Sequence, residues 1–455
     1  MWSALTLALF WSRGASAEGG AIVGQPWLKD RKVAGGDGLS TKNLVFHPSV
    51  SGEFGFDSNY YQRSGTAVDD NNFGPVVPML RFRVTPSISM ESKPLPAPAE
   101  GALNQPLPRL VQYGASANLT YNEFISLDSE FRAEVSSLRR LMGGASAYLN
   151  LFERRTWAVN GSLTYQYIAE PSNQPGAGAA FDRSLIIGGA NLVWTPGGGS
   201  FSWTLIDVAT DFTLFARPSF NSYNRGNYAF TTRGRWNFLP KTALIFDGSV
   251  GAVSYSESVK NNGRTSEARV GLSGLLTNRL SATVIAGWAV GNFTGSNAPV
   301  DYNNLVGAAQ LEYFFKSSEQ KKKSDGHDVG VSSLTGGYQR SFAPSFLGDF
   351  FRRDRGYLRG KYMAGGRFLT TLEAGVAGVA YPDYVSAGVP GVNDGFTEYR
   401  LDLQAFGEYR PLSSLGVNLT LRYDQNISQV VQGIDFEDDL SFKRFKAFLG
   451  VRWFM

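Results

Sequence analysis

The sequence predicts a transmembrane antiparallel β-barrel of about 18 strands, with 16 also possible. Two observations lead to this prediction. Apolar and polar residues alternate along most of the chain, in segments of roughly ten residues or more, which is the side-chain period of a β-strand. Aromatic residues gather near the ends of the apolar faces, as the two membrane interfaces require of a barrel.

The composition excludes several other classes of protein. Charged residues make up 18% of the 455 residues, and the mean hydropathy is −0.17. A helical membrane protein is disfavoured, because each of its spans needs about 20 mostly apolar residues. The absence of cysteine excludes disulfides, cysteine-based zinc sites and iron–sulfur clusters. A net charge of +4, from 43 basic and 39 acidic residues, is too balanced to indicate a nucleic-acid partner.

The N-terminus predicts export from the cytoplasm. Residues 5–11 form a short apolar run, and the Ala-Ser-Ala at 15–17 fits the small-residue rule for signal-peptide cleavage. We therefore expect a signal peptide at 1–17, a periplasmic N-terminal segment at 18–43 and a barrel at 44–455. This places the protein in the outer membrane of a Gram-negative bacterium, where outer-membrane lipid surrounds it.

The alternation defines nineteen candidate strands, which are longer than the five or six residues usual in soluble proteins. They are 47–61, 77–91, 110–122, 128–138, 143–152, 156–169, 183–195, 201–217, 227–238, 241–256, 265–276, 279–291, 302–314, 327–340, 356–364, 367–381, 396–410, 415–427 and 441–454. A closed bacterial barrel needs an even number of strands. One candidate must therefore be wrong, and we place the surplus strand between 110 and 170, where the turn signals are weakest.

Charged residues on the polar faces are candidates for the lining of a pore. An Arg or Lys that faces lipid costs about 2–4 kcal/mol at the bilayer midplane, so these side chains should face inward. The candidates are Arg81, Arg83, Arg233, Arg235, Arg359, Lys361, Glu398, Arg400, Asp402, Glu408, Arg422 and Asp424. The same argument extends to Arg132 and Glu134 on candidate strand 128–138. Such charges either pair with one another and hydrate the wall, or form a conduit for a large hydrophilic substrate.

The last strand also resembles the terminal signal that the outer-membrane barrel assembly machinery reads. Its apolar face is Phe445, Leu449, Val451, Trp453 and Met455, together with Ala447 between the first two. The machinery is therefore an expected partner. The alternative is an ordinary amphipathic edge strand.

The sequence gives no indication of catalysis. It holds only two histidines, His47 and His327, which we interpret as interface or turn residues. Acidic clusters at 69–72 and 435–439 lack the spacing and glycine of a calcium loop. Phosphate-loop and dinucleotide-binding motifs are missing as well. We therefore expect no enzyme activity, no catalytic residues, no metal and no cofactor.

Residues 235–244 and 274–283 resemble the turn-centred segments of an outer-membrane family called beta-barrel porin 2, and the similarity extends over roughly 227–455. Residues 341–348 and 354–357 look like the next loop and strand start of that family. Its members accompany bacterial exopolysaccharide and capsule export systems. The resemblance thus implies a conduit for secretion of a surface polysaccharide, with a periplasmic export protein as partner. The alternatives are a general diffusion porin and a structural barrel that anchors a surface complex.

Overall fold

A computed structural model gives the fold of the chain. The described residues are 38–64, 76–93, 110–153, 155–169, 182–258, 260–295, 299–315, 332–345, 348–364, 367–383, 394–428, 430–432 and 437–455. The predicted signal peptide, most of segment 18–43, His327 and the acidic cluster at 69–72 lie outside them. None of the helices formed by the described residues is long and apolar enough to cross a membrane.

The alternating segments form long strands of 12 to 17 residues in the barrel wall. In chain order the strands are β1 (Leu39–Ser40), β2 (Leu44–Asp57), β3 (Met79–Ser92), β4 (Val111–Ser126), β5 (Arg140–Leu151), β6 (Trp157–Ile168), β7 (Arg183–Trp194), β8 (Phe201–Phe215), β9 (Arg225–Leu239), β10 (Thr242–Tyr255), β11 (Asn262–Leu275), β12 (Leu280–Thr294), β13 (Tyr302–Phe314), β14 (Ser333–Pro344), β15 (Phe350–Ala364), β16 (Phe368–Tyr381), β17 (Phe396–Leu412), β18 (Leu415–Ser428), β19 (Val430–Gln432), β20 (Glu437–Asp439) and β21 (Phe442–Phe454). Short helices are α1 (Arg132–Ser136), η3 (Gly197–Gly199) and η4 (Pro218–Tyr223).

Eighteen antiparallel strands close into a barrel, which confirms the predicted fold class and strand number. Each strand from β2 to β18 pairs with the next along the chain, and β21 closes the ring between β18 and β2. β1 adds only a short pairing to β2, while β19 and β20 form a separate two-stranded sheet. A closed ring leaves no strand edge unpaired in lipid, so it satisfies the condition for a sheet to span a bilayer.

The surplus candidate strand is 128–138, which lies between 110 and 170, where the sequence predicts the surplus strand. Residues 132–136 form helix α1, so the prediction of a strand there is wrong, and Arg132 and Glu134 do not lie on the barrel wall. The physical reason is the apolar period. Phe131, Val135 and Leu138 recur at helical spacing and pack on a cluster that includes Tyr60 and Phe124.

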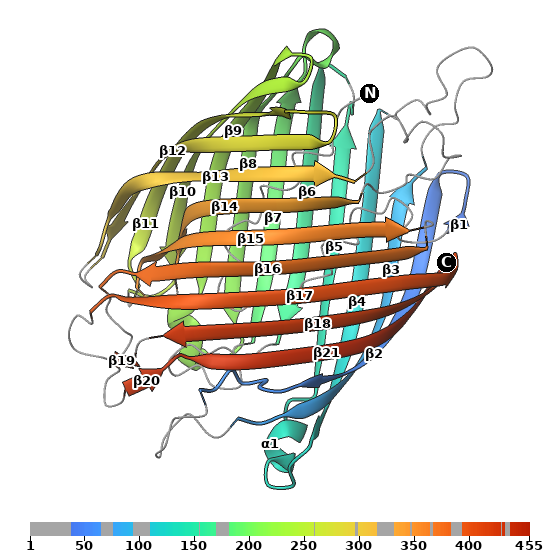
Figure 1. Cartoon of the computed structure of the whole chain (residues 1–455), viewed down its shortest axis with the longest axis vertical. Helices are drawn as coiled ribbons and strands as arrows, with labels where there is room; N and C mark the ends of the chain where they lie inside the picture. Colours follow the sequence, from blue (N-terminus) through green and yellow to red (C-terminus); the bar gives the residue numbers. More distant parts are fainter. Residues whose placement is uncertain are drawn as a thin grey trace.

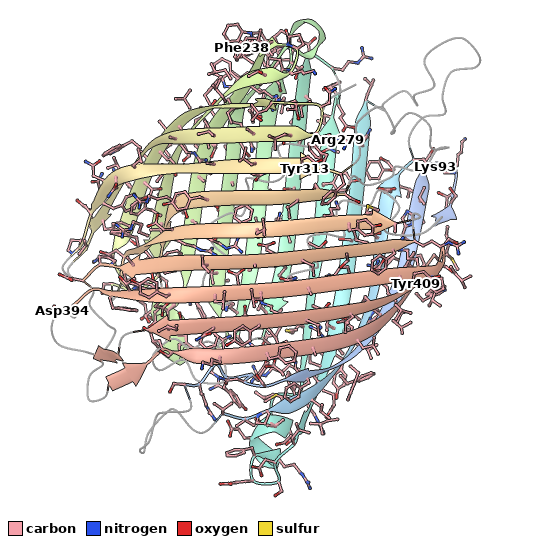
Figure 2. All side chains as sticks on the ribbon, in the orientation of Figure 1. Lys93, Phe238, Arg279, Tyr313, Asp394 and Tyr409 are labelled. Atoms are coloured by element: carbon pink, nitrogen blue, oxygen red, sulfur yellow. The ribbon has the colours of Figure 1, made fainter. Side chains whose placement is uncertain are left out.

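The two ends of the barrel differ in the lengths of the connections between the strands. Figure 1 shows α1 and the β19–β20 hairpin at the end away from the C-terminus. In Figure 2, Asp394 marks this loop end, whereas Lys93, Tyr313 and Tyr409 lie toward the opposite, turn end. Because short turns face the periplasm and long loops face the exterior, the loop end is the cell-surface end.

Large apolar side chains are exposed on the outer face, as expected for a barrel in lipid. Exposed aromatic residues gather near the turn ends of the strands: Trp157, Trp236, Phe238, Tyr313, Tyr362, Phe368, Tyr409 and Trp453. A second group lies toward the loop ends: Tyr121, Tyr165, Tyr228, Trp288, Tyr338, Tyr399 and Phe445. Two aromatic girdles with apolar residues between them are the signature of a membrane-spanning barrel, so the protein is an outer-membrane β-barrel.

The tip of the β14–β15 hairpin leaves the wall and enters the mouth of the barrel. Pairing between β13 and β14 ends at Gly307 and Arg340. Beyond that pair, Phe342 stacks on Tyr302, with ring centroids 4.5 Å apart, although Tyr302 belongs to the inner face of β13. Gly291 leaves the space for this Tyr302 ring, since a Cβ there would lie 2.1 Å from a ring carbon.

Polar contacts hold this hairpin tip against the loops of neighbouring strands. The Lys260 ammonium donates to the Gly348 carbonyl over 2.6 Å, and the Tyr255 hydroxyl donates to the Ser345 carbonyl over 3.2 Å. Asp349 accepts hydrogen bonds from the Asn261 amide and from the Val300 backbone N–H. The described part of the mouth above β10–β13 is therefore partly filled by the chain itself.

Candidate functional site: the charged inner wall

The predicted pore residues all lie on the strand faces opposite the exposed apolar side chains. On β9, for example, Arg233 and Arg235 alternate with Trp236 and Phe238, which are 51% and 42% exposed on the outer face. On β17, Arg400 and Asp402 alternate with the exposed Tyr399 and Leu403 in the same way. This placement follows from the strand period alone, whereas the contacts among these side chains come only from the closed barrel.

One charged cluster joins the two ends of the chain. Asp57 of β2 is fully buried and accepts two hydrogen bonds from Arg444 of β21, over 2.9 and 2.6 Å. Arg81 of β3 donates to the same carboxylate over 3.2 Å and lies over the rings of Tyr60 and Phe124. A single carboxylate therefore connects the last strand with the first two strands of the barrel.

A second cluster crosses three strands. Arg355 of β15 donates to Glu373 of β16 over 2.8 Å and to Asp402 of β17 over 2.6 Å. The other carboxylate oxygen of Glu373 accepts from Arg359 over 2.7 Å. Beside them, Arg400 pairs with the buried Glu398 and donates to the Tyr381 hydroxyl over 3.2 Å.

Further charged pairs continue toward the turn end of the same side. Glu408 is buried and accepts from Arg410 over 2.7 Å and from Arg452 over 3.1 Å. Arg83 pairs with Glu53 at 2.9 Å. On β18, Arg422 donates to Asp424 over 2.8 Å, and Lys446 lies 3.6 Å from the second Asp424 oxygen.

Basic side chains outnumber acidic ones on the inner face of the arc that runs from β15 through β21 and β2 to β3. The basic residues are Arg81, Arg83, Arg353, Arg355, Arg359, Lys361, Arg400, Arg410, Arg422, Arg444, Lys446 and Arg452. The acidic residues are Glu53, Asp57, Glu91, Glu373, Glu398, Asp402, Glu408 and Asp424. We call this surface the charged arc.

The inner wall from β4 to β7 is different, because most of its side chains are neutral and its charges, such as Arg140 paired with Asp182, lie at the loop end. The Ser116 and Ser146 hydroxyls lie 2.7 Å apart, and the Asn160 amide donates to Asn191 over 2.7 Å. Charges return on β8 to β11, where Arg233 pairs with Asp207 and Arg269 donates to Asp247 over 2.9 Å.

Two inward arginines have no described carboxylate within ion-pair distance. Arg353 lies near the loop end of β15, where Arg355 and Arg400 act on it as like charges. Arg235, toward the turn end of β9, donates to the Asn237 side chain over 3.0 Å. These two guanidiniums are therefore not held by a carboxylate of the described residues.

Several residues of these clusters were missed from the sequence. Arg353 and Arg355 fall just before candidate strand 356–364, in a predicted loop, although they share the parity of Arg359. β15 in fact begins at Phe350. Asp57, Glu373, Arg410 and Arg444 lie on predicted strands with inward parity, and that parity was the signal available for them.

The predicted assembly signal lies on the outer face of β21. Phe445, Leu449, Val451, Trp453 and Met455 are all exposed, while Phe448 and Phe454 on the other face are buried. His47 lies at this junction, where its Nδ1 is 3.3 Å from the Met455 carbonyl oxygen. Recognition by the assembly machinery stays a prediction.

No group of His, Cys, Asp or Glu side chains within the described residues could hold a metal ion. Part of the acidic cluster at 435–439 lies outside these residues, so the statement covers only its described end.

No protein-family model matches the chain, and no curated protein sequence matches it. Solved structures match over most of its length at low identity. The outer membrane protein opdK from Pseudomonas aeruginosa is 10% identical with a TM-score of 0.46, and the match covers 90% of this chain and 99% of that one. OccAB4 from Acinetobacter baumannii is 12% identical with a TM-score of 0.42, covering 92% and 99%.

The siderophore receptor PirA from Pseudomonas aeruginosa has a similar TM-score of 0.40 at 9% identity, covering 92% of this chain and 81% of the receptor. Proteins described so differently match to a similar degree, so these similarities do not distinguish between functions. The resemblance to the beta-barrel porin 2 family is correct as far as an outer-membrane β-barrel. Its association with polysaccharide export is not shown.

Proposed function

We propose that the protein is a porin-like channel that lets small hydrophilic solutes cross the outer membrane, with a preference for anions. The observation that carries the proposal is the surplus of basic side chains on the charged arc, together with Arg353 and Arg235, which lack described carboxylate partners. The proposal follows the general diffusion porin of the sequence analysis, and not the conduit for polysaccharide secretion.

The clusters would serve a channel in two ways. Paired charges of both signs keep the wall hydrated without binding any solute tightly. Guanidiniums distributed from the loop end at Arg353 to the turn end at Arg410 and Arg452 offer an anion successive weak contacts. Passage requires such contacts, because a single strong site would retain the solute.

Conductance measurements test this proposal on the purified full-length barrel in planar bilayers. In a salt gradient, the reversal potential should indicate selectivity for chloride over potassium. Changing Arg353→Gln and Arg235→Gln together should move the reversal potential toward that of a non-selective pore. The matched control is Arg264→Gln, because Arg264 is an exposed arginine on the outer face of β11.

Other outcomes would replace the proposal. A correctly folded barrel that never conducts ions would support a structural role. A deletion strain that makes polysaccharide but fails to display it, while solute uptake stays normal, would restore the export reading. Cation selectivity would contradict the proposed preference for anions, although the protein would still be a channel for small solutes.

A further inference from the structure

A compact ionic cluster lies on the outer face of the barrel at the loop ends of β14 and β15. Arg340 of β14 donates its Nε–H to Asp354 of β15 over 2.5 Å, and the Arg352 Nε lies 3.4 Å from the other carboxylate oxygen. The Tyr338 hydroxyl also donates to Asp354, over 2.5 Å. We call Tyr338, Arg340, Arg352 and Asp354 the outer cluster.

The exposure of these side chains shows that they face outward. Tyr338 is 46% exposed and lies on the same face as Leu334 and Leu358, which are 41% and 53% exposed. The Arg340 and Arg352 side chains are 32% and 42% exposed. The charged groups are therefore accessible from the membrane side of the wall, and not from the lumen.

The depth of the cluster corresponds to lipid headgroups. Arg340 is four residues from the loop end of β14, and Tyr338 belongs to the aromatic girdle at that end. Arginines at the bilayer midplane would cost about 2–4 kcal/mol each, and this cost falls to about 0–1 kcal/mol near the interface. Arginine just beyond an aromatic girdle meets phosphate groups rather than acyl chains.

The cluster carries an excess of positive charge. Two guanidiniums share one carboxylate, so one positive charge is uncompensated among the described residues. Guanidinium N–H groups match the oxygens of a phosphate in a paired geometry, which makes arginine well suited to bind this group.

The arrangement of the strands gives a lipid access to the guanidiniums of Arg340 and Arg352. β14 separates from β13 beyond the Gly307–Arg340 pair, so the cluster lies where the wall divides. Leu305 of β13 is 48% exposed beside this point. A phosphorylated lipid could thus place its headgroup on the arginines and an acyl chain along the apolar surface below.

We propose that the outer cluster binds a phosphate group of lipid A, the anchor of the lipopolysaccharide in the outer leaflet. The loop end faces the cell exterior, and lipid A is the phosphorylated lipid of that leaflet. Asp354 and Tyr338 position the two arginines, whose remaining N–H groups contact the phosphate. This site is independent of the channel function proposed above, because its side chains point away from the lumen.

Binding of lipid A to the full-length barrel in mixed micelles, followed by native mass spectrometry, tests this inference. Changing Arg340→Gln and Arg352→Gln together should weaken binding by about tenfold or more. Wild-type protein should lose affinity to a similar extent when the lipid A is dephosphorylated. Arg279→Gln is the matched control, because this arginine lies in a turn toward the periplasmic end (Figure 2) and should leave the affinity unchanged.

Equal lipid A affinity in the double variant and the wild type would overturn the proposal. So would equal binding of phosphatidylglycerol, which would show a site for any anionic lipid. If the double variant fails to fold, Asp354→Asn gives a second test. It frees both arginines from their carboxylate, so it should tighten binding of lipid A, and unchanged or weaker binding would contradict the assignment.

Discussion

The inner and outer faces of the barrel use arginine in different ways. On the inner face, Arg81, Arg355 and Arg444 lie in clusters with carboxylates from two or three strands, and the ring of strands brings these groups together. On the outer face, Arg340 and Arg352 occupy only the loop end, beyond an aromatic girdle. The difference shows that parity decides whether a charge meets water or lipid, while height along the strand decides whether lipid tolerates it.

The largest expected effect comes from moving a charge across the wall within the apolar band. Leu372 of β16 is 55% exposed on the outer face, and its neighbour Thr371 lies on the inner face opposite Lys361. Leu372→Asp should prevent accumulation of the folded barrel, because it places a carboxylate in the apolar band. Thr371→Asp should yield a folded barrel, since Lys361 can pair with the new charge. Heat-modifiable gel mobility of outer-membrane fractions measures both, and equal tolerance would reject the assigned faces.

A smaller but still severe effect is expected from the buried cluster of the inner face. Asp57→Asn would leave Arg81 and Arg444 without their shared negative charge, and breaking a buried ion pair costs about 3–5 kcal/mol. The unfolding temperature in detergent should fall markedly. Asp247→Asn is the control, because its partner Arg269 is 24% exposed and keeps Glu267 at 2.8 Å. A similar fall of the unfolding temperature in both variants would show that the Asp57 cluster stabilises the barrel no more than the Asp247 pair does.

The sequence predicts the two faces well because both depend only on the two-residue period of a strand. Arg81, Arg233, Arg400 and Arg422 were all assigned the inner face that the structure gives them. Partners such as Asp57 for Arg444 could not be predicted, since these residues are 387 positions apart and meet only when β21 closes the ring. The strand prediction for segment 128–138 is wrong because polar residues separate its apolar residues at the two-residue period of a strand and also at the period of a helix.

A third comparison separates a lipid-facing role of β21 from a role in assembly. Val451 of β21 and Val376 of β16 are both exposed on the outer face, at 48% and 60%. If the last strand is read by the assembly machinery, Val451→Ala should slow appearance of the folded barrel in cells more than Val376→Ala does. Pulse–chase labelling with gel-mobility readout would detect this delay. Equal rates would favour an ordinary amphipathic edge strand.

The smallest effect is expected at the hairpin tip, where the distinction between the two faces breaks down. Phe342 and Phe350 share the parity of outward residues, yet they pack against Tyr302 of the inner face because β14 has left the wall. Asp349 lies in the loop of this tip, outside the membrane-spanning strands. Burial raises the pKa of its carboxyl above the ordinary value, although hydrogen bonds from Val300 and Asn261 and the charge of Lys260 oppose the shift.

The raised pKa of Asp349 predicts that the tip is held more firmly in acid. An acid whose pKa is higher in the folded state binds more protons there than in the open state, so the packed tip gains stability as pH falls toward the raised pKa. Amide exchange of the tip, corrected for the intrinsic effect of pH on exchange, should therefore show stronger protection at pH 5 than at pH 8. Asp349→Asn should remove most of this pH dependence while keeping an acceptor for the Val300 N–H. If the variant retains the full dependence, another group controls the tip, and Asp301, whose negative charge also raises the Asp349 pKa, would be the next to replace.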